Sequence, residues 1–209
     1  MNVRTLTLLA LLVPILSGCI GAAAVGVGAG ALIYADRRAT ETVFTDEGIE
    51  IRATNRIREK FGDRVHVNVT SYNRTVLLTG EVPDAAARDE IEKMVSGVVN
   101  VKAISNELAV AGHSSLSSRS NDVFITSKVK ARFIDAAQVS PVHVKVVTEN
   151  GVVYLMGLVT QGESTAAVEI ARTTGGVMKV VRVFEIISDA EARRLDPQKT
   201  APQPAAPVK

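Results

Sequence analysis

"VHVNVTSYNRTVLLTGEV" (65–82) and "VHVKVVTENGVVYLMGLV" (142–159) align without a gap at a constant shift of 77 residues. Each stretch begins with alternating valines, passes through a short polar turn and ends on a V-x-L-x-G-x-V pattern. Self-similarity at a fixed period indicates that a chain is built from repeated structural units. The sequence therefore predicts two copies of one small module.

The signals around each stretch occur in the same order and predict an αββαβ unit. Asn150-Gly151 in the second copy is a strong signal for a two-residue hairpin turn, so the first two strands should be antiparallel. The second strand, the following helix and the third strand should form a right-handed parallel crossover. We expect an α+β protein in which each unit is a three-stranded mixed sheet with two helices on one face. A further hypothesis is that the units pack together through their uncovered sheet faces.

The N-terminal stretch "MNVRTLTLLALLVPILSGC" has the form of a secretory signal, with basic Arg4, an apolar segment at 6–16 and small residues before Cys19. The "LSGC" run resembles the lipobox of bacterial lipoproteins, and this resemblance implies cleavage before Cys19 and attachment of acyl chains there. Ile20, rather than aspartate, after the cysteine favours export to the outer membrane. The alternative is an uncleaved signal anchor.

Composition shifts along the chain give the expected domain boundaries. The spacer after Cys19 is rich in Gly and Ala, the linker is rich in Ser, and the C-terminal segment is rich in Pro, which favours disorder. The predicted segments are a lipoprotein signal peptide (1–18), a lipidated spacer (19–45), domain 1 (46–110), a linker (111–120), domain 2 (121–188) and a disordered tail (189–209).

The αββαβ order with V-x-L-x-G-x-V on the second strand resembles the BON domain, and two such units behind a lipobox resemble the dual BON-domain outer-membrane lipoproteins. "NDVFITSKVKARF" and "VTENGVVYLMGLV" carry the match in the second copy. The resemblance implies a lipid-anchored outer-membrane protein with periplasmic domains that support envelope integrity, and binding of anionic phospholipid through the second domain. Gly80 and Gly157 fall on the signature glycine of the family. Physically, a glycine there indicates close backbone approach.

The first predicted helix of the second copy, within 121–138, has apolar residues on two faces. At about 100° per residue, Ile125, Val129 and Phe133 form a core stripe. A second, narrower patch lies almost opposite this stripe, with a lysine on each side. The candidate phospholipid-binding residues are Phe124, Ser127, Lys128, Lys130, Ala131 and Ile134.

The first copy provides an internal control for this patch. A shift of 72 residues aligns the two core stripes, and the patch positions then become Arg52, Asn55, Glu59 and Gly62. Only the second copy would then expose an apolar patch edged with lysines, which is typical of a helix at a membrane interface. The alternative is a periplasmic adaptor whose patch binds domain 1, a second copy of the chain or an envelope protein.

The remaining residues predict no catalytic, cofactor or metal site. We expect His66 and His143 to face solvent rather than ligate a metal, and His113 lies in the predicted linker. No spacing of His, Cys or carboxylates is typical of a catalytic or metal site. We therefore expect no enzymatic activity, no cofactor and no metal. With 24 basic and 22 acidic side chains there is no basic footprint for nucleic acid, and the oligomeric state stays open.

Overall fold

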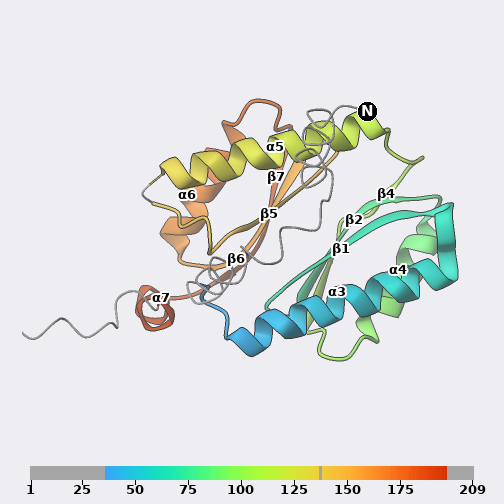
Figure 1. The fold of residues 1–209 in the computed structure, drawn as a ribbon, viewed down its shortest axis with the longest axis horizontal. Helices are drawn as coiled ribbons and strands as arrows, with labels where there is room; N and C mark the ends of the chain where they lie inside the picture. The colour runs from blue at the N-terminus through green and yellow to red at the C-terminus, as the bar shows by residue number, and fades with distance from the viewer. Residues whose placement is uncertain (1–35, 137, 197–209) are drawn as a thin grey trace, which may run out of the picture. The chain divides into compact units, whose positions relative to one another are not determined.

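The computed structural model describes residues 36–136 and 138–196 (Figure 1). The predicted signal peptide, Cys19 and most of the predicted spacer lie outside these residues, as does the tail from 197 onward. Within the described part, no helix combines the length and the apolar character that crossing a membrane requires.

The first module forms a mixed sheet of four strands. In chain order it contains α3 (Thr40–Phe61), the 3-10 turn η1 (Gly62–Arg64), β1 (His66–Tyr72), β2 (Thr75–Val82), α4 (Ala85–Ser96), β3 (Ala103–Asn106) and β4 (Ala109–Val110). β1 pairs with β2 antiparallel, and β2 pairs with both β3 and β4 in parallel. We expected one last strand where the structure has β3 and β4. The strand is interrupted because the Asn106 side chain accepts a hydrogen bond from the Leu108 N–H, while Leu108 packs into the core.

The second module has the three-stranded sheet that the sequence predicts. It contains α5 (Leu116–Asp135), β5 (Lys145–Glu149), β6 (Val152–Val159), α6 (Gln161–Arg172), β7 (Lys179–Ile186) and α7 (Asp189–Leu195). The strand order is β5-β6-β7, with an antiparallel hairpin and a parallel crossover. The predicted α+β class and the tandem αββαβ order are confirmed.

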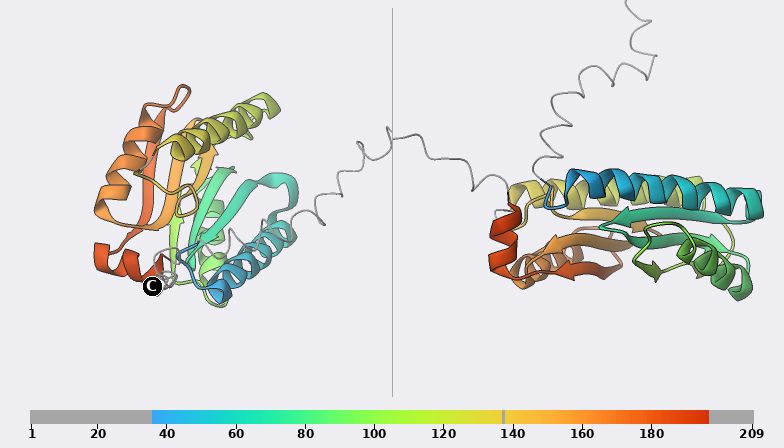
Figure 2. Two further views of the ribbon diagram at one scale, coloured as in Figure 1. Left: turned by 60° about the vertical axis from the view of Figure 1, so that its left-hand side comes forward. Right: turned by 90° about the horizontal axis from the view of Figure 1, so that it is seen from below.

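Three helices extend into segments that we predicted to be spacer, linker and tail. α3 begins within the predicted spacer, α5 within the Ser-rich linker, and α7 occupies the first part of the predicted tail (Figure 2). Ser115, one of the serines that suggested a linker, instead caps α5, since its side chain accepts from the Ser118 N–H. Ser188, at the end of predicted domain 2, caps α7 by accepting from the Glu191 N–H. Composition alone does not distinguish a helix cap from a flexible linker.

The helices of each module cover one face of its sheet, as Figure 1 shows. In the first module α3 and α4 bury the face of β2 that carries Val76, Leu78 and Val82. In the second, α5 and α6 bury the face of β6 that carries Val153, Leu155 and Val159. The aliphatic character of both cores agrees with the alternation of valine and leucine along these strands.

The opposite sheet faces bury a third cluster that spans both modules. Tyr72 and Leu77 of the first module pack with Tyr154, Met156 and Leu158 of the second. The two modules therefore pack through the faces that their helices leave uncovered.

The structure overturns the solvent-facing assignment of His66 and His143, whose side chains are only 19% and 12% exposed. His66 lies on β1, whose face away from the helices is covered by the second module. His143 lies in the turn before β5, and its Nε2 is 3.6 Å from Asp196 Oδ1 in the segment that follows α7.

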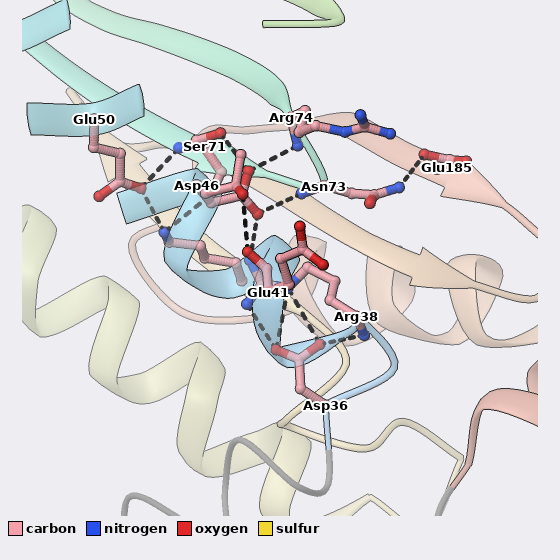
Figure 3. A network of polar contacts seen from close by, with 11 residues as sticks. Asp36, Arg38, Glu41, Asp46, Glu50, Ser71, Asn73, Arg74 and Glu185 are labelled. Atoms are coloured by element: carbon pink, nitrogen blue, oxygen red, sulfur yellow. Dashed lines mark hydrogen bonds and ion pairs between the residues drawn. The ribbon is translucent and has the colours of Figure 1, made fainter. Parts of the chain in front are cut away.

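Polar contacts surround the apolar contact between the modules. Asn68 Nδ2 donates to Glu149 Oε2 at 2.8 Å, and Asn150 Nδ2 donates to Glu81 Oε1 at 2.6 Å. Farther along the sheets, Asn73 donates to a carboxylate oxygen of Glu185 at 2.8 Å (Figure 3). Buried polar groups require such partners, so these bonds fix the register of one module on the other.

Gly80 and Gly157 lie inside β2 and β6, two residues before each strand ends. A Cβ atom on Gly80 would lie 2.0 Å from the His66 carbonyl oxygen, and on Gly157 it would lie 2.3 Å from that of His143. Gly80 also has a φ of 113°, which L side chains rarely adopt. In both modules the carbonyl of this histidine, at or just before the first strand, lies too close to the second strand for any side chain at the glycine position.

Candidate functional site

Helix α5 is held in one rotation by contacts on its inner face. Ile125, Val129 and Phe133 are fully buried. The Asp122 carboxylate accepts hydrogen bonds from the N–H groups of Asn150 (2.9 Å) and Gly151 (2.8 Å), which form the β5–β6 turn. Because the helix is tied to both the core and the turn, its opposite face is fixed toward the outside of the module.

This outer face carries four large apolar side chains. Phe124 is 61% exposed and Ile134 is 71% exposed, as the helical pattern predicts. Leu116 and Val123 are 81% and 68% exposed, and on the helical wheel both lie within about 20° of Ile134. We define the outer face of α5 as Leu116, Val123, Phe124, Ser127, Ala131 and Ile134.

The sequence analysis missed Leu116 and Val123. Leu116 was assigned to the linker because the surrounding residues are mostly serine. The detectable signal was Ser115 directly before an apolar residue that lies on the same face as the later patch positions, which is typical of a helix N-terminus. Val123 lay within the predicted helix but was not assigned to either stripe.

A lysine lies at each edge of the outer face. Lys128 Nζ is 4.6 Å from the centre of the Phe124 ring, a cation–π arrangement, and also donates to the Gly175 carbonyl. Lys130 is exposed on the other edge. Between the lysines, Ser127 Oγ donates to the Val123 carbonyl at 2.9 Å, so its hydroxyl is satisfied within the helix. The face therefore combines exposed apolar groups with cationic borders.

The structure corrects the alignment of the two first helices by one helical turn. In the first module Asp46 accepts from the N–H groups of Asn73 and Arg74 in the β1–β2 turn, as Figure 3 shows. Asp122 has the same role in the second module, so the equivalent residues differ by 76 rather than by the predicted 72. A shift of four keeps nearly the same helix face, so the core pattern alone could not distinguish the two registers.

The corrected register changes the internal control. The positions equivalent to Phe124, Ser127, Ala131 and Ile134 are Gly48, Ile51, Asn55 and Arg58. Ile51 and Phe44 are exposed on α3, so the wholly polar outer face that we expected in the first module was wrong. The first module has two large exposed apolar residues on this helix and the second has four, with a glycine and an arginine in place of Phe124 and Ile134.

A groove of about 460 Å³ adjoins the outer face of α5 and reaches the strands of both modules. Val123, Ser127 and Lys130 of α5 line one side, and His66 and Glu149 lie on the strand side. Burial raises the pKa of the Glu149 carboxyl, an effect that the hydrogen bond from Asn68 only partly offsets. The groove therefore brings a buried acidic residue and a histidine close to the candidate membrane-facing helix.

Glu81 lies deeper beside the same groove and is almost fully buried. Burial alone would raise its pKa, but hydrogen bonds from Asn150, His66 and the Ser114 N–H lower the pKa below its usual value. His66 Nδ1 lies 2.9 Å from Glu81 Oε2. His66, Glu81 and Glu149 place one potential ligand atom each within 4.8 Å of one another.

The model of the BON domain matches this chain at residues 51–112 and 121–188, more than half of its length. The chain belongs to the BON-domain family. Both matched ranges begin after the first residues of α3 and α5, so the two helices extend beyond the matched segments in the N-terminal direction.

Several curated BON-domain relatives resemble the chain. It is 36% identical over 174 residues to the outer membrane lipoprotein DolP of Haemophilus influenzae, a match covering 82% of this chain and 90% of that protein. It is 31% identical over 154 residues to a 21 kDa hemolysin of Actinobacillus pleuropneumoniae, covering 73% and 79%. It is 35% identical over 117 residues to the osmotically-inducible protein Y of Escherichia coli, covering 54% and 58%.

Proposed function

We propose that this protein is a non-enzymatic outer-membrane lipoprotein, anchored through Cys19, whose periplasmic BON domains engage anionic phospholipid through the outer face of α5 and support envelope integrity. Similarity to an outer membrane lipoprotein along most of both chains supports the location. The "LSGC" run at the end of the predicted signal supports the anchor.

The observation that carries the lipid assignment is the outer face of α5 itself. Four large apolar side chains project from a helix whose rotation is fixed by the core and by Asp122, and lysines border them on both sides. Helices that lie in a membrane interface have this combination of apolar face and basic edges. Aromatic and aliphatic groups enter the boundary between headgroups and acyl chains, while lysines reach the phosphates.

Binding by the face alone should be weak. Complete burial of each large apolar side chain is worth roughly 1.5–3 kcal/mol, and each lysine near an anionic surface adds about 1 kcal/mol. Insertion from one side buries only part of each side chain, and association costs offset much of the gain. An acyl anchor raises the effective concentration to about the millimolar range, at which weak contacts suffice to hold the domain on the membrane.

Flotation with liposomes tests the proposal. Full-length protein whose Cys19 is replaced by Ser, so that no anchor forms, should bind vesicles containing phosphatidylglycerol more strongly than vesicles of phosphatidylcholine alone. Phe124→Glu combined with Ile134→Glu should weaken this binding at least about tenfold. The matched control is Ile51→Glu, which introduces the same charge at an exposed apolar residue of α3.

Circular dichroism should show that all variants fold, since Phe124, Ile134 and Ile51 are all exposed. Unchanged vesicle binding by the Phe124→Glu, Ile134→Glu variant would overturn the assignment. If that variant instead lost an envelope protein in crosslinking while binding vesicles normally, the outer face of α5 would be an adaptor surface.

A further inference from the structure

His66, Glu81 and Glu149 meet where the two modules pack. His66 comes from β1, Glu81 from β2 and Glu149 from β5, so two of the three belong to the first module and one to the second. Their ligand atoms lie within 4.8 Å of one another. Both carboxylates are more than nine-tenths buried, and the His66 side chain is 19% exposed toward the groove.

Side-chain amides orient the two carboxylates toward this point. Asn150 holds Glu81 by Oε1, so that Oε2 faces His66 Nδ1 at 2.9 Å. Asn68 holds Glu149 by Oε2, and within 36–136 and 138–196 no hydrogen bond goes to its Oε1. Metal-ligating carboxylates commonly use one oxygen for the ion while the other is held by such an outer-shell donor.

The charge of the cluster also favours a cation. Burial raises the pKa of Glu149, and the negative charges of Glu81 and Asp122 raise it further. Within the described part of the chain, neither Glu81 nor Glu149 forms an ion pair with a lysine or arginine. Glu81 is stabilised by donors from Asn150, His66 and Ser114, whereas within the described residues Glu149 accepts a hydrogen bond from Asn68 alone. Ionised Glu149 is therefore costly, and a bound cation would offset that cost.

We propose that His66, Glu81 and Glu149 form a binding site for one divalent transition-metal ion, with Zn²⁺ as the best fit, that links the two BON domains. One imidazole nitrogen and two carboxylate oxygens suit Zn²⁺ better than Mg²⁺ or Ca²⁺, which prefer oxygen ligands alone. The ligand atoms need to move inward by small side-chain rotations, since Zn²⁺ bonds are about 2.0–2.2 Å long. A water molecule from the groove completes a tetrahedral set. The His66–Glu81 hydrogen bond is then replaced by shared coordination.

Binding is tested on the full-length protein in detergent, with Cys19 replaced by Ser so that no thiol can bind metal. Competition against a chromophoric chelator should show one Zn²⁺ per chain. The melting temperature should rise with added Zn²⁺ and stay constant with equal Mg²⁺, because an ion that binds only the folded state stabilises it. Affinity should fall from pH 7.0 to pH 5.5, because a metal ion binds only deprotonated ligand atoms.

His66→Gln and Glu149→Gln should each weaken Zn²⁺ binding at least tenfold and abolish the rise in melting temperature. His113→Gln, at an exposed histidine of the inter-domain segment, is the matched control and should bind as the parent does. Glu149→Gln keeps the shape of the side chain and removes a buried charge, so it should fold without metal.

Parent-like Zn²⁺ binding by Glu149→Gln or His66→Gln would overturn the site. So would loss of binding in His113→Gln, or binding with no change in melting temperature. None of these outcomes depends on membrane binding, so the site can fail without affecting the proposed function of α5.

Discussion

The two BON domains have similar interiors and differ on the exposed face of their first helix. Asp46 and Asp122 each accept hydrogen bonds from the hairpin turn of their own domain, and Gly80 and Gly157 each allow the close approach of a histidine carbonyl. The difference lies in exposed side chains that nothing in the fold requires. Residues repeated in both domains therefore report the fold, and residues that differ at equivalent exposed positions indicate what one domain does alone.

The largest expected effect comes from the shared glycines. Gly80→Ala places a Cβ 2.0 Å from the His66 carbonyl oxygen in a backbone conformation that alanine rarely adopts. We expect a loss of about 4 kcal/mol or more, which corresponds to roughly 8–16 °C in melting temperature for a chain of this size. Thermal unfolding of the full-length protein in detergent, followed by circular dichroism, measures this loss.

Gly157→Ala is the matched variant in the second domain. It meets a carbonyl at 2.3 Å without the positive φ, so it should also destabilise the protein, but less than Gly80→Ala does. If both variants melt within 2 °C of the parent, the strands can separate at no cost and the glycines do not constrain the fold.

Replacing the aspartates that bind the hairpin turns should reduce stability less than replacing Gly80 does. Asp46 accepts hydrogen bonds from Ser71 Oγ and from two turn N–H groups, and it forms an ion pair with Arg38 at 2.8 Å. Asp122 shares with it only the two hydrogen bonds from the turn. Asp46→Ala should cost about 3–4 kcal/mol, because it leaves the turn N–H groups and Ser71 Oγ without their acceptor and leaves the Arg38 guanidinium paired with Asp36 alone. Asp122→Ala should cost about 2–3 kcal/mol.

Melting temperatures of these two variants give the ranking directly. Arg38→Ala gives an upper limit for the extra ion pair, since it leaves the turn bonds of Asp46 in place but also removes the pair with Asp36 and the contact with the Tyr72 ring. Equal losses in Asp46→Ala and Asp122→Ala would mean that the Arg38 pair and the Ser71 hydrogen bond together contribute nothing to stability.

The fold could be predicted because its determinants recur locally in the chain. Alternating valines, the Asn150-Gly151 turn and the helical spacing of Ile125, Val129 and Phe133 specify elements whose order then fixes the sheet topology. The register between the first helices could not be predicted, since a shift of one helical turn preserves the core stripe. The hydrogen bonds from the turns to Asp46 and Asp122 fix it, and they connect residues far apart in sequence.

The candidate sites were predictable to different degrees. Phe124 and Ile134 contradict the amphipathic pattern of their own helix, so the sequence reveals them. Glu81 and Glu149 each follow a normal strand pattern, and His66 resembles a solvent-facing residue until a second sheet covers it. Clusters formed by packing between domains leave no local pattern in the sequence.

Transplanting the outer face of α5 to α3 is a direct test of the difference between the domains. Gly48→Phe with Arg58→Ile places the two missing apolar side chains at the equivalent positions, and only the flexible Arg52 side chain approaches a Cβ at Gly48. Added to the Phe124→Glu, Ile134→Glu variant, this graft should strengthen vesicle binding by about three- to tenfold. That gain is roughly what partial burial of one large apolar side chain contributes to binding.

Flotation with phosphatidylglycerol vesicles measures the restoration. Gly48→Ser with Arg58→Gln is the control, because it changes the same positions without adding apolar area. If graft and control bind alike, exposed apolar area on this helix face is not sufficient, and the surroundings of α5, including its lysines and the adjoining groove, are also required.

The smallest expected effect concerns charge at the edge of the face. Lys130 is exposed beside the groove, and its equivalent on α3 is Thr54. Lys130→Thr should weaken binding to anionic vesicles by about 1 kcal/mol, or roughly fivefold, at 0.05 M salt. The same change should have little effect at 0.5 M salt, where screening confines the attraction to a few ångströms.

Lys93→Thr, on the exposed side of α4, is the control, because it alters the net charge equally and should change vesicle binding less. A Lys130→Thr effect that persists at high salt would assign this lysine to a direct contact within the groove rather than to long-range attraction toward the membrane.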